Sequence, residues 1–368
     1  MTSRADDERF MARAIEISRR HTGLTDTNPS VGCILVKNGE IIAEAVTAIG
    51  GRPHAERQAL DMAGEAARGA TAYVTLEPCS HYGRTPPCAN ALVDFGIARV
   101  VVAVDDPDDR VSGRGYEILR KAGIEVGTGL LRREAERELA GYLTRKMKKR
   151  PHVILKIAVS SDGMIGRAGE GQVAITGPLA RQAVHELRAH CDGILVGLRT
   201  AIADDPELTV RLPGLEHRSP VRFVLDRRLE LPLSSKLVTT ARDVPTVVAA
   251  IGTDLFSSGL LEEGIASRRR ALQSANVEIL EAPSLDDFLT VLAHRGMSQL
   301  LVEGGAFAAK AFLDAGLVDR ILLFESPVVV GAGGLESPLR RADIPGEFIF
   351  VGETPHGPDR CFEFERQI

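Results

Sequence analysis

The sequence lacks any apolar run of about 18 residues, which a membrane-spanning helix requires. Its N-terminus also lacks a signal-peptide pattern, because residues 8–20 predict an amphipathic helix instead. Cysteine is scarce, and its odd count of 5 argues against a disulfide framework and fits a reducing compartment. We therefore expect a cytoplasmic protein with no membrane partner.

An excess of positive charge is missing too, since 45 Lys and Arg face 50 Asp and Glu, a net charge of −5. This argues against the broad phosphate-binding surface of a nucleic-acid-binding protein, although it allows a local basic pocket. The densest basic run, residues 145–150, is better explained as a solvated helix end and linker than as a nucleic-acid contact. At about 150 residues per domain, two or three domains are expected, and we place a boundary here, giving domains 1–147 and 148–368.

Both parts alternate short β runs with helical segments, which indicates layered α/β domains. In the first part, apolar runs at 31–36 and 41–46 flank Asn38-Gly39, a strong hairpin turn signal. The second part restarts with a strand at 152–159. Its further strand candidates are residues 193–196, 221–225, 246–250, 277–280, 299–302 and 320–324.

One imidazole, two thiols and a carboxylate occur within a short stretch of the first part. His54, Cys79 and Cys88 supply three of the four tetrahedral ligands that zinc prefers, leaving the fourth position for water. Water held there ionises near neutral pH. Glu56 is too close in sequence to His54 to serve as a ligand and is placed to move protons. This His-x-Glu plus Pro-Cys arrangement is typical of zinc deaminases.

Two other interpretations of these residues compete with a catalytic site. His81 could complete a four-ligand structural zinc site, but this leaves Glu56 unexplained. Alternatively, the cysteines could bind no metal at all. The combination of both motifs favours catalysis, although each motif alone is weak.

Several longer motifs resemble the family of bifunctional riboflavin-biosynthesis deaminase/reductases, and the match covers nearly the full length. The motifs are Asn28-Pro-Ser-Val-Gly32, His54-Ala-Glu56, Thr75-Leu-Glu-Pro-Cys79 continuing to Cys88, Asp106-Pro107, Gly113-Arg-Gly115, Lys156-Ile-Ala158, the Asp204 to Arg211 stretch and Glu303-Gly-Gly305. The resemblance implies an N-terminal cytidine-deaminase-like α/β/α domain and a C-terminal α/β domain similar to dihydrofolate reductase.

For the first domain, the resemblance implies one zinc ion per chain and hydrolytic deamination of 2,5-diamino-6-ribosylamino-4(3H)-pyrimidinone 5′-phosphate. Glu56 would take the proton of the attacking water, pass it to the ring nitrogen and later protonate ammonia. Asn28, Arg84 and Asp106 would contact the substrate. From the residues alone, Asn28 and Asp106 could equally be turn residues and Arg84 a surface-loop cation.

For the second domain, the resemblance implies NADPH-dependent reduction of the ribosyl group to ribityl, giving 5-amino-6-ribitylaminouracil 5′-phosphate. The cofactor contacts carried over by position are Ala158, Ala174, Thr200, Asp204, Gly305, Ala306, Phe307, Ala308, Ala309, Lys310 and Ala311. The substrate contacts are Gln172, Arg188, Leu208, Arg211 and Glu303. Either Lys156 or Glu303 would assist proton transfer to the opened sugar.

The second domain also departs from the family pattern. The Ser-x-Trp usual before Ile175 is absent, in a chain with no tryptophan, and Arg227 replaces the Ser that usually follows the strand aspartate. Taken alone, Gly304-Gly305 indicates only a tight strand-to-helix turn, and Arg188 and Arg211 are explained as phosphate clamps or as ion pairs.

Two functions other than that of a bifunctional deaminase/reductase are also compatible with the sequence. One is a single-activity deaminase acting on a free nucleotide or on tRNA, and the negative net charge argues against tRNA. The other is a zinc-stabilised nucleotide-binding or sensor protein without catalysis. We expect small phosphorylated pyrimidines as partners, no nucleic acid, and an assembly of identical chains.

Overall fold

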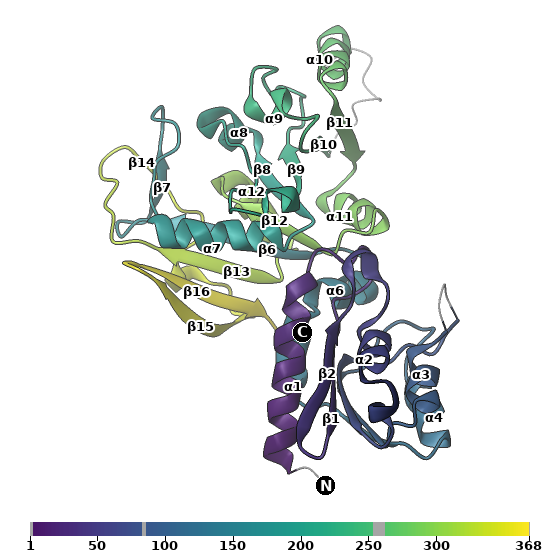
Figure 1. Cartoon of the computed structure of the whole chain (residues 1–368). Coiled ribbons are helices and arrows are strands. Elements are labelled where there is room, and N and C mark those ends of the chain that lie inside the picture. The colour runs from purple at the N-terminus through teal and green to yellow at the C-terminus, as the bar shows by residue number, and fades with distance from the viewer. Residues whose placement is uncertain (1–2, 83–85, 253–261, 368) are drawn as a thin grey trace. The chain divides into compact units, whose positions relative to one another are not determined.

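The computed structural model describes residues 3–82, 86–252 and 262–367. The chain divides into two compact units, Met1–Lys149 and Arg150–Ile368 (Figure 1), so the division falls two residues after the boundary at 147/148 placed from the sequence. Within the described ranges, no helix has both the length and the apolar character needed to cross a membrane.

The first unit is built on a sheet with strand order β2-β1-β3-β4-β5. Its strands are β1 (Gly32–Lys37), β2 (Glu40–Val46), β3 (Thr71–Leu76), β4 (Arg99–Val104) and β5 (Glu125–Thr128). Its helices are α1 (Arg4–Ser18), α2 (Ala55–Ala63), α3 (Cys88–Asp94), α4 (Arg114–Lys121), α5 (Arg132–Glu138) and α6 (Ala140–Lys148). β1 pairs antiparallel with β2 and β3, whereas β3, β4 and β5 run parallel.

Helices cover both faces of this sheet. α1 packs on β1 and β3 beside α5, whereas α2 packs on β1 and β2 next to α3. The predicted α/β/α arrangement is therefore confirmed. The hairpin is confirmed as well, because Asn38 and Gly39 join β1 to β2 with φ values of 54° and 82°, as a two-residue hairpin turn requires. Towards the end of the unit, α5 and α6 follow each other directly and meet at Leu139.

The second unit contains a large sheet with strand order β11-β10-β9-β8-β12-β6-β13-β16-β15, beside a small one of β14 and β7. The strands are β6 (His152–Val159), β7 (Met164–Arg167), β8 (Gly193–Gly197), β9 (Val221–Leu225), β10 (Thr246–Ile251), β11 (Val277–Ala282), β12 (Gln299–Glu303), β13 (Arg320–Glu325), β14 (Gly334–Glu336), β15 (Phe348–His356) and β16 (Asp359–Arg366). The helices are α7 (Pro178–Ala189), α8 (Leu198–Asp204), α9 (Lys236–Thr239), α10 (Glu262–Ser274), α11 (Leu285–His294) and α12 (Ala306–Asp314).

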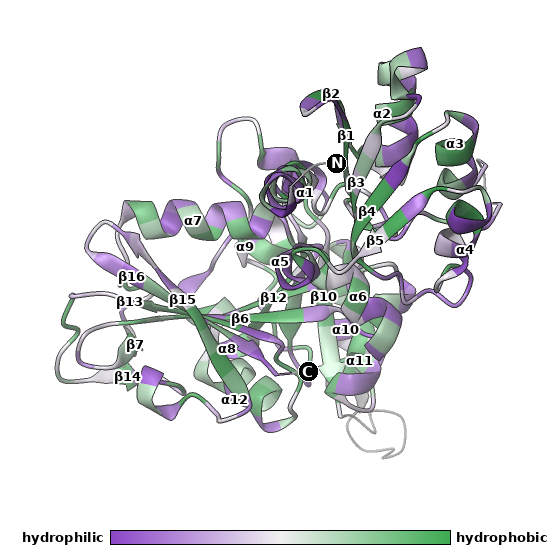
Figure 2. Cartoon of the chain, turned by 90° about the horizontal axis from the view of Figure 1, so that it is seen from below, coloured by the Kyte–Doolittle hydropathy of each residue, from purple (hydrophilic) through white to green (hydrophobic). Residues whose placement is uncertain are grey.

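The strands from β11 to β13 in this order run parallel and are buried on both faces. Alternate residues of β6 enter two different hydrophobic clusters, with Leu155 on the α11 and α12 side and Ile154 on the α8, α9 and α10 side. Parallel strands covered in this way form near-continuous apolar runs, and Figure 2 colours much of β6 as hydrophobic. This burial explains why the sequence located these strands.

Two features of the second unit differ from expectation. The antiparallel hairpin β15–β16, which completes the sheet beside β13, was not predicted. β15 is an edge strand with mostly half-exposed or exposed residues, so it lacks the apolar run of the parallel strands. Conversely, the Asp204 to Arg211 stretch, whose residues alone indicate a loop entering a strand, leads out of α8 into an irregular loop.

The basic run at 145–150 is less solvated than predicted. Lys146 pairs with the buried Asp108 at 2.7 Å, within the first unit. Arg150 is buried at the start of the second unit, where its guanidinium binds both carboxylate oxygens of Asp319. The Arg150 guanidinium outweighs burial and holds the pKa of the Asp319 carboxyl well below its usual range. Lys146 therefore fixes the last helix of the first unit, and Arg150 fixes the first residues of the second unit.

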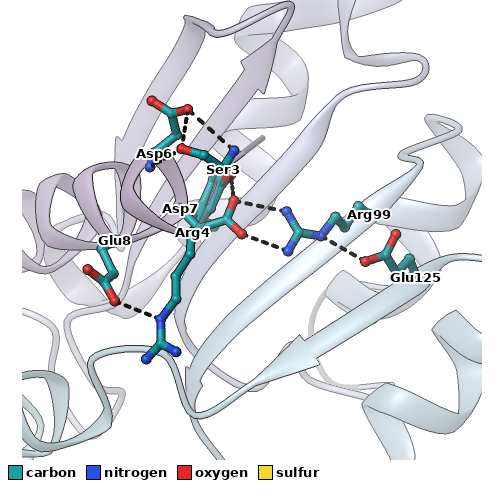
Figure 3. A network of polar contacts seen from close by, with 8 residues as sticks. Ser3, Arg4, Asp6, Asp7, Glu8, Arg99 and Glu125 are labelled. Atoms are coloured by element: carbon teal, nitrogen blue, oxygen red, sulfur yellow. Dashed lines mark hydrogen bonds and ion pairs between the residues drawn. The ribbon is translucent and has the colours of Figure 1, made fainter. Parts of the chain in front are cut away.

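A buried carboxylate ties the first turn of α1 to the sheet (Figure 3). Asp7 accepts two hydrogen bonds from the Arg99 guanidinium, at 2.9 and 2.8 Å, and a third from the Tyr73 hydroxyl. Arg99 also pairs with Glu125 at 3.1 Å. The helix itself begins with a capping box, in which Ser3 and Asp6 exchange hydrogen bonds.

We expect Asp7→Asn to lower the free energy of unfolding of the first unit by about 1–3 kcal/mol, because a charge-assisted pair becomes a neutral contact beside a buried arginine. All four tyrosines lie in this unit and the chain has no tryptophan, so tyrosine emission during urea unfolding follows this unit alone. The control is Asp61→Asn, in an exposed helical pair with Arg57, which should change stability by about 0.5 kcal/mol or less. Equal effects of the two variants would contradict the role of Asp7.

Candidate deaminase and reductase sites

Three potential zinc ligands meet at the ends of secondary-structure elements in the first unit. His54 is the N-cap of α2, Cys79 lies three residues after β3, and Cys88 is the first residue of α3. His54 Nδ1 lies 3.7 Å from Cys79 Sγ and 3.4 Å from Cys88 Sγ. Among the described residues, these three form a cluster whose ligand atoms all lie within 4.8 Å of one another.

These separations fit a tetrahedral zinc ion. Zn–N bonds of about 2.0–2.1 Å and Zn–S bonds of about 2.3 Å at tetrahedral angles place nitrogen and sulfur roughly 3.6 Å apart. Cys79 Sγ also accepts the backbone N–H of Cys88 at 3.3 Å. A hydrogen bond from the Cys88 thiol lowers the pKa of Cys79 to about 4, so this sulfur favours the thiolate form that ligation requires.

Glu56 and His81 both stay outside the cluster. Glu56 lies in the first turn of α2 and is buried, with 4% exposure. Burial raises the pKa of its carboxyl to about 7. A buried carboxylate beside the ligands, and not among them, is the position that proton transfer at an open metal site needs. The four-ligand structural site with His81 has no support in this geometry.

Glu77 is a site residue that the sequence did not single out. Its buried carboxylate accepts backbone N–H groups from Gly113 and Gly115, each at 3.1 Å. A Cβ at Gly115 would stand 2.3 Å from the carbonyl oxygen of Pro78, so only glycine allows this approach. Glu77 therefore fixes the loop that follows Asp106 against the Pro78-Cys79 turn. The sequence features that could have indicated this role are the position of Glu77 inside the Thr75–Cys79 motif and the separate Gly113-Arg-Gly115 motif.

The predicted deaminase substrate contacts have different surroundings. Asn28 is half-buried, and its side-chain amide donates to the carbonyl of Gly51 at 3.3 Å. Asp106 is buried and already accepts the Asp108 N–H at 2.9 Å and the Tyr142 hydroxyl at 2.8 Å. Arg84 lies outside the described residues. The turn-forming role of Asp106 is thus observed directly, while substrate contact stays a prediction for all three.

In the second unit, a buried ion pair lies at the carboxyl end of β12. Arg188, from α7, binds Glu303 through two hydrogen bonds of 2.6 and 2.7 Å and also donates to the carbonyl of Thr209. Their side chains are only 11% and 9% exposed. Burial opposes ionisation of Glu303, but Arg188 outweighs it and holds the pKa of that carboxyl below its ordinary value. Arg188 is therefore a buried partner of Glu303 and not a surface cation.

Lys156 is the register partner of Glu303 on the neighbouring strand β6. Its ammonium lies 5.7 Å from the centre of the Phe324 ring. Burial lowers the pKa of Lys156, which makes its ammonium group a stronger proton donor. Lys156, Glu303 and Arg188 thus form one charged cluster at the carboxyl end of β12, and ligands of open α/β sheets bind at such strand ends.

A glycine turn next to this cluster fits a dinucleotide. Gly304 and Gly305 both have positive φ, 71° and 78°, and lead into α12. A Cβ at Gly305 would lie 2.5 Å from Thr200 Oγ1, so the backbone of this turn passes close to the start of α8. Backbone N–H groups at such a turn suit a pyrophosphate. Two predicted contacts, Ala308 and Ala309, have side chains in the core, so they reach a cofactor only through backbone.

The remaining predicted positions differ in burial. Ala158, Asp204 and Ala311 are half-buried, whereas Gln172, Ala174, Ala306, Phe307 and Lys310 are exposed. Leu208 is buried with a positive φ of 55°, and Arg211 is exposed beside Glu207 at 3.1 Å.

Arg222 was missed, although it supports the loop that carries Leu208 and Arg211. It is fully buried on β9 and donates to the carbonyls of Glu207, Leu237 and Val244. Burial lowers its pKa to about 10, which leaves it charged at neutral pH. A single arginine within an apolar strand gave no signal, because its carbonyl partners are distant in sequence.

Comparison with known proteins matches both units. The family model described as "RibD C-terminal domain" matches residues 151–345, and "Cytidine and deoxycytidylate deaminase zinc-binding region" matches residues 4–104. The riboflavin biosynthesis protein RibD of Aquifex aeolicus is 40% identical and covers 89% of this chain and 88% of its own length. That of Escherichia coli is 39% identical over 96% and 98%.

Solved structures agree over the full length. Acinetobacter baumannii RibD in its form 1 matches with a TM-score of 0.85 and 35% identity, covering 100% of both chains. A Thermotoga maritima diaminohydroxyphosphoribosylaminopyrimidine deaminase/5-amino-6-(5-phosphoribosylamino)uracil reductase matches with a TM-score of 0.84 and 34% identity over 99% of both chains.

Proposed function

The chain belongs to the RibD family of bifunctional riboflavin-biosynthesis deaminase/reductases, and from this premise we propose which residues carry out each reaction. The first unit deaminates 2,5-diamino-6-ribosylamino-4(3H)-pyrimidinone 5′-phosphate. The second unit reduces the product with NADPH to 5-amino-6-ribitylaminouracil 5′-phosphate. The meeting of His54, Cys79 and Cys88 beside a buried carboxylate is the observation that carries this proposal.

In the deaminase unit, His54, Cys79 and Cys88 would hold a zinc ion, which when bound acts as a Lewis acid and makes water nucleophilic near neutral pH. Glu56 would take the first proton of the attacking water and deliver it to the ring nitrogen. It would then move the second proton, from the hydroxyl left on the ring carbon, to the amine, which leaves as ammonia while the carbonyl forms. Glu77 positions the loop that follows Asp106, and Asn28, Arg84 and Asp106 are the proposed substrate contacts.

In the reductase unit, the Gly305 turn and Thr200 would hold the pyrophosphate part of NADPH, which when bound is the hydride donor for C1′ of the ribosyl group. The bond between C1′ and the ring oxygen breaks in this reduction, so that oxygen needs a proton. Lys156 is the proposed donor, because the ion pair with Arg188 keeps Glu303 ionised. Glu303 and Arg188, with Arg211 at the pocket edge, would orient the substrate hydroxyls and phosphate.

We expect zinc removal to separate the two activities. Protein treated with a chelator should lose ammonia release from the diaminopyrimidinone phosphate, since its water is no longer activated. It should keep NADPH oxidation with pre-deaminated substrate, because no residue of the metal cluster belongs to the second unit. Ultraviolet spectra and mass analysis of the products, with and without NADPH, measure both steps.

Re-addition of zinc is the control and should restore ammonia release. Unchanged substrate with zinc-replete protein, with and without NADPH, would contradict the proposed function and leave only a binding role. Loss of both activities on chelation, reversed by zinc, would instead show that the metal stabilises the whole chain.

The remaining assignments concern surroundings and assembly. All five cysteines are free and four of them are buried, which supports a reducing cytoplasm. The net charge of −5 supports small phosphorylated pyrimidines over nucleic acids as partners. An assembly of identical chains is part of the proposal, and analytical ultracentrifugation tests it.

A further inference from the structure

Two arginines leave the carboxyl ends of adjacent parallel strands at the same height. β8 and β9 pair up to Gly197 and Leu225, and Arg199 and Arg227 each stand two residues beyond that pair (Figure 1 labels both strands). Both residues are exposed, and among the described residues neither side chain has an ion-pair or hydrogen-bond partner. Paired strands lie about 4.8 Å apart, so Arg227 and Arg199, which is in the first turn of α8, belong to neighbouring segments from which two long side chains can extend to one anion.

The turn after β9 is built so that its carboxylate faces inward and its arginine outward. Asp226 is buried, and its two oxygens accept the backbone N–H groups of Arg228 at 3.1 Å and Leu231 at 2.8 Å. In Rossmann dinucleotide-binding folds, an acidic side chain after a strand binds the ribose hydroxyls of NAD, whereas a nearby arginine accommodates the 2′-phosphate of NADP. Here the acid is engaged by the protein backbone and the arginine is free.

The orientation that the cofactor would have also brings its adenosine half toward these two arginines. This step depends on the proposed function, in which the hydride is delivered beside Glu303, the last residue of β12, and its register partner Lys156 on β6. The Gly305 turn meets Thr200 one strand further on, after β8. A dinucleotide with its pyrophosphate at that turn therefore places its adenosine half toward β8 and β9, on the side of Arg199 and Arg227.

We propose that Arg199 and Arg227 together bind the 2′-phosphate of NADPH and determine the preference for NADPH over NADH. The planar guanidinium offers paired N–H donors that match phosphate oxygens. Arg227 stands where the family usually has serine, so this chain places a charge where the family pattern has a single hydroxyl. The pair thus supplies the recognition that the glycine turn, which contacts only the part common to both cofactors, lacks.

The test is titration of the full-length, zinc-loaded protein with NADPH and with NADH by isothermal calorimetry, without substrate. Arg227→Gln and Arg199→Gln should each raise the Kd for NADPH about tenfold or more, and the double variant about a hundredfold. The Kd for NADH should stay within about twofold in all of them, because NADH has no group at this position.

Arg228→Gln is the matched control. It removes the same charge from the same turn, but Arg228 is paired with Glu230 at 3.4 Å. It should change the NADPH Kd by less than about threefold, which calibrates the long-range effect of charge alone. Equal losses for NADPH and NADH, or equal effects of Arg227→Gln and Arg228→Gln, would overturn the assignment while leaving the reductase function intact. Wild-type protein that binds neither cofactor would overturn the reductase function and this inference with it.

Discussion

Glu56→Gln should reduce ammonia release by about 10²–10⁴-fold, the range that a positioned acid–base group contributes, while the purified protein keeps its zinc. Glutamine preserves the size of the side chain in a buried position but cannot accept the proton of water. Glu56 is not one of the residues whose ligand atoms cluster, which are His54, Cys79 and Cys88. Ammonia release and zinc content, the latter by elemental analysis, are measured on the same preparation.

Two controls make this result specific. Glu117→Gln changes an exposed carboxylate on α4 of the same unit and should leave ammonia release unchanged. NADPH oxidation with pre-deaminated substrate should proceed at the wild-type rate in Glu56→Gln, because the reductase residues belong to the other unit. A variant purified without zinc would show instead that Glu56 maintains the metal site, and a variant with full activity would remove it from the mechanism.

The residues whose positions the sequence could anticipate are those tied to local patterns. The ends of β3 and the starts of α2 and α3 follow from apolar runs and proline signals, and these ends carry Cys79, His54 and Cys88. Because all three ligands lie at such ends, the sequence was enough to predict that they come together. The parallel strands were found for a similar reason, since burial on both faces demands unbroken apolar stretches.

The residues that were missed or reinterpreted depend on contacts between distant segments. Arg222 is buried because the carbonyls of two loops converge on it, and Glu77 is buried because glycine N–H groups from the loop after Asp106 reach it. Asp106 is held by Tyr142 from α6, a partner 36 positions further along the chain. No periodicity records such pairings, so a single sequence predicts the charge but not its partner.

The same limit applied to Arg188, for which the sequence favoured a phosphate or hydroxyl clamp and left a surface ion pair open. Because the structure buries it against Glu303, we expect Arg188→Leu to destabilise the second unit by about 3–5 kcal/mol, the cost of leaving one charge of a buried pair uncompensated. Glu303→Leu should have an effect of similar size. The double variant should be within about 2 kcal/mol of wild type, because apolar side chains of similar volume can replace a buried pair. Urea unfolding followed by far-ultraviolet circular dichroism measures these differences.

Tyrosine emission, which reports only the first unit, is the internal control and should give the same midpoint for all variants. Arg360→Leu, in the exposed pair with Glu353, provides the matched surface variant and should cost less than about 1 kcal/mol. Activity cannot replace this measurement, since the proposed mechanism places Arg188 and Glu303 at the substrate and all three buried-pair variants should lose reductase activity. Strictly additive effects of the two single changes would mean that the residues do not stabilise each other in the folded unit, and the substrate-clamp interpretation of Arg188 would then stand alone.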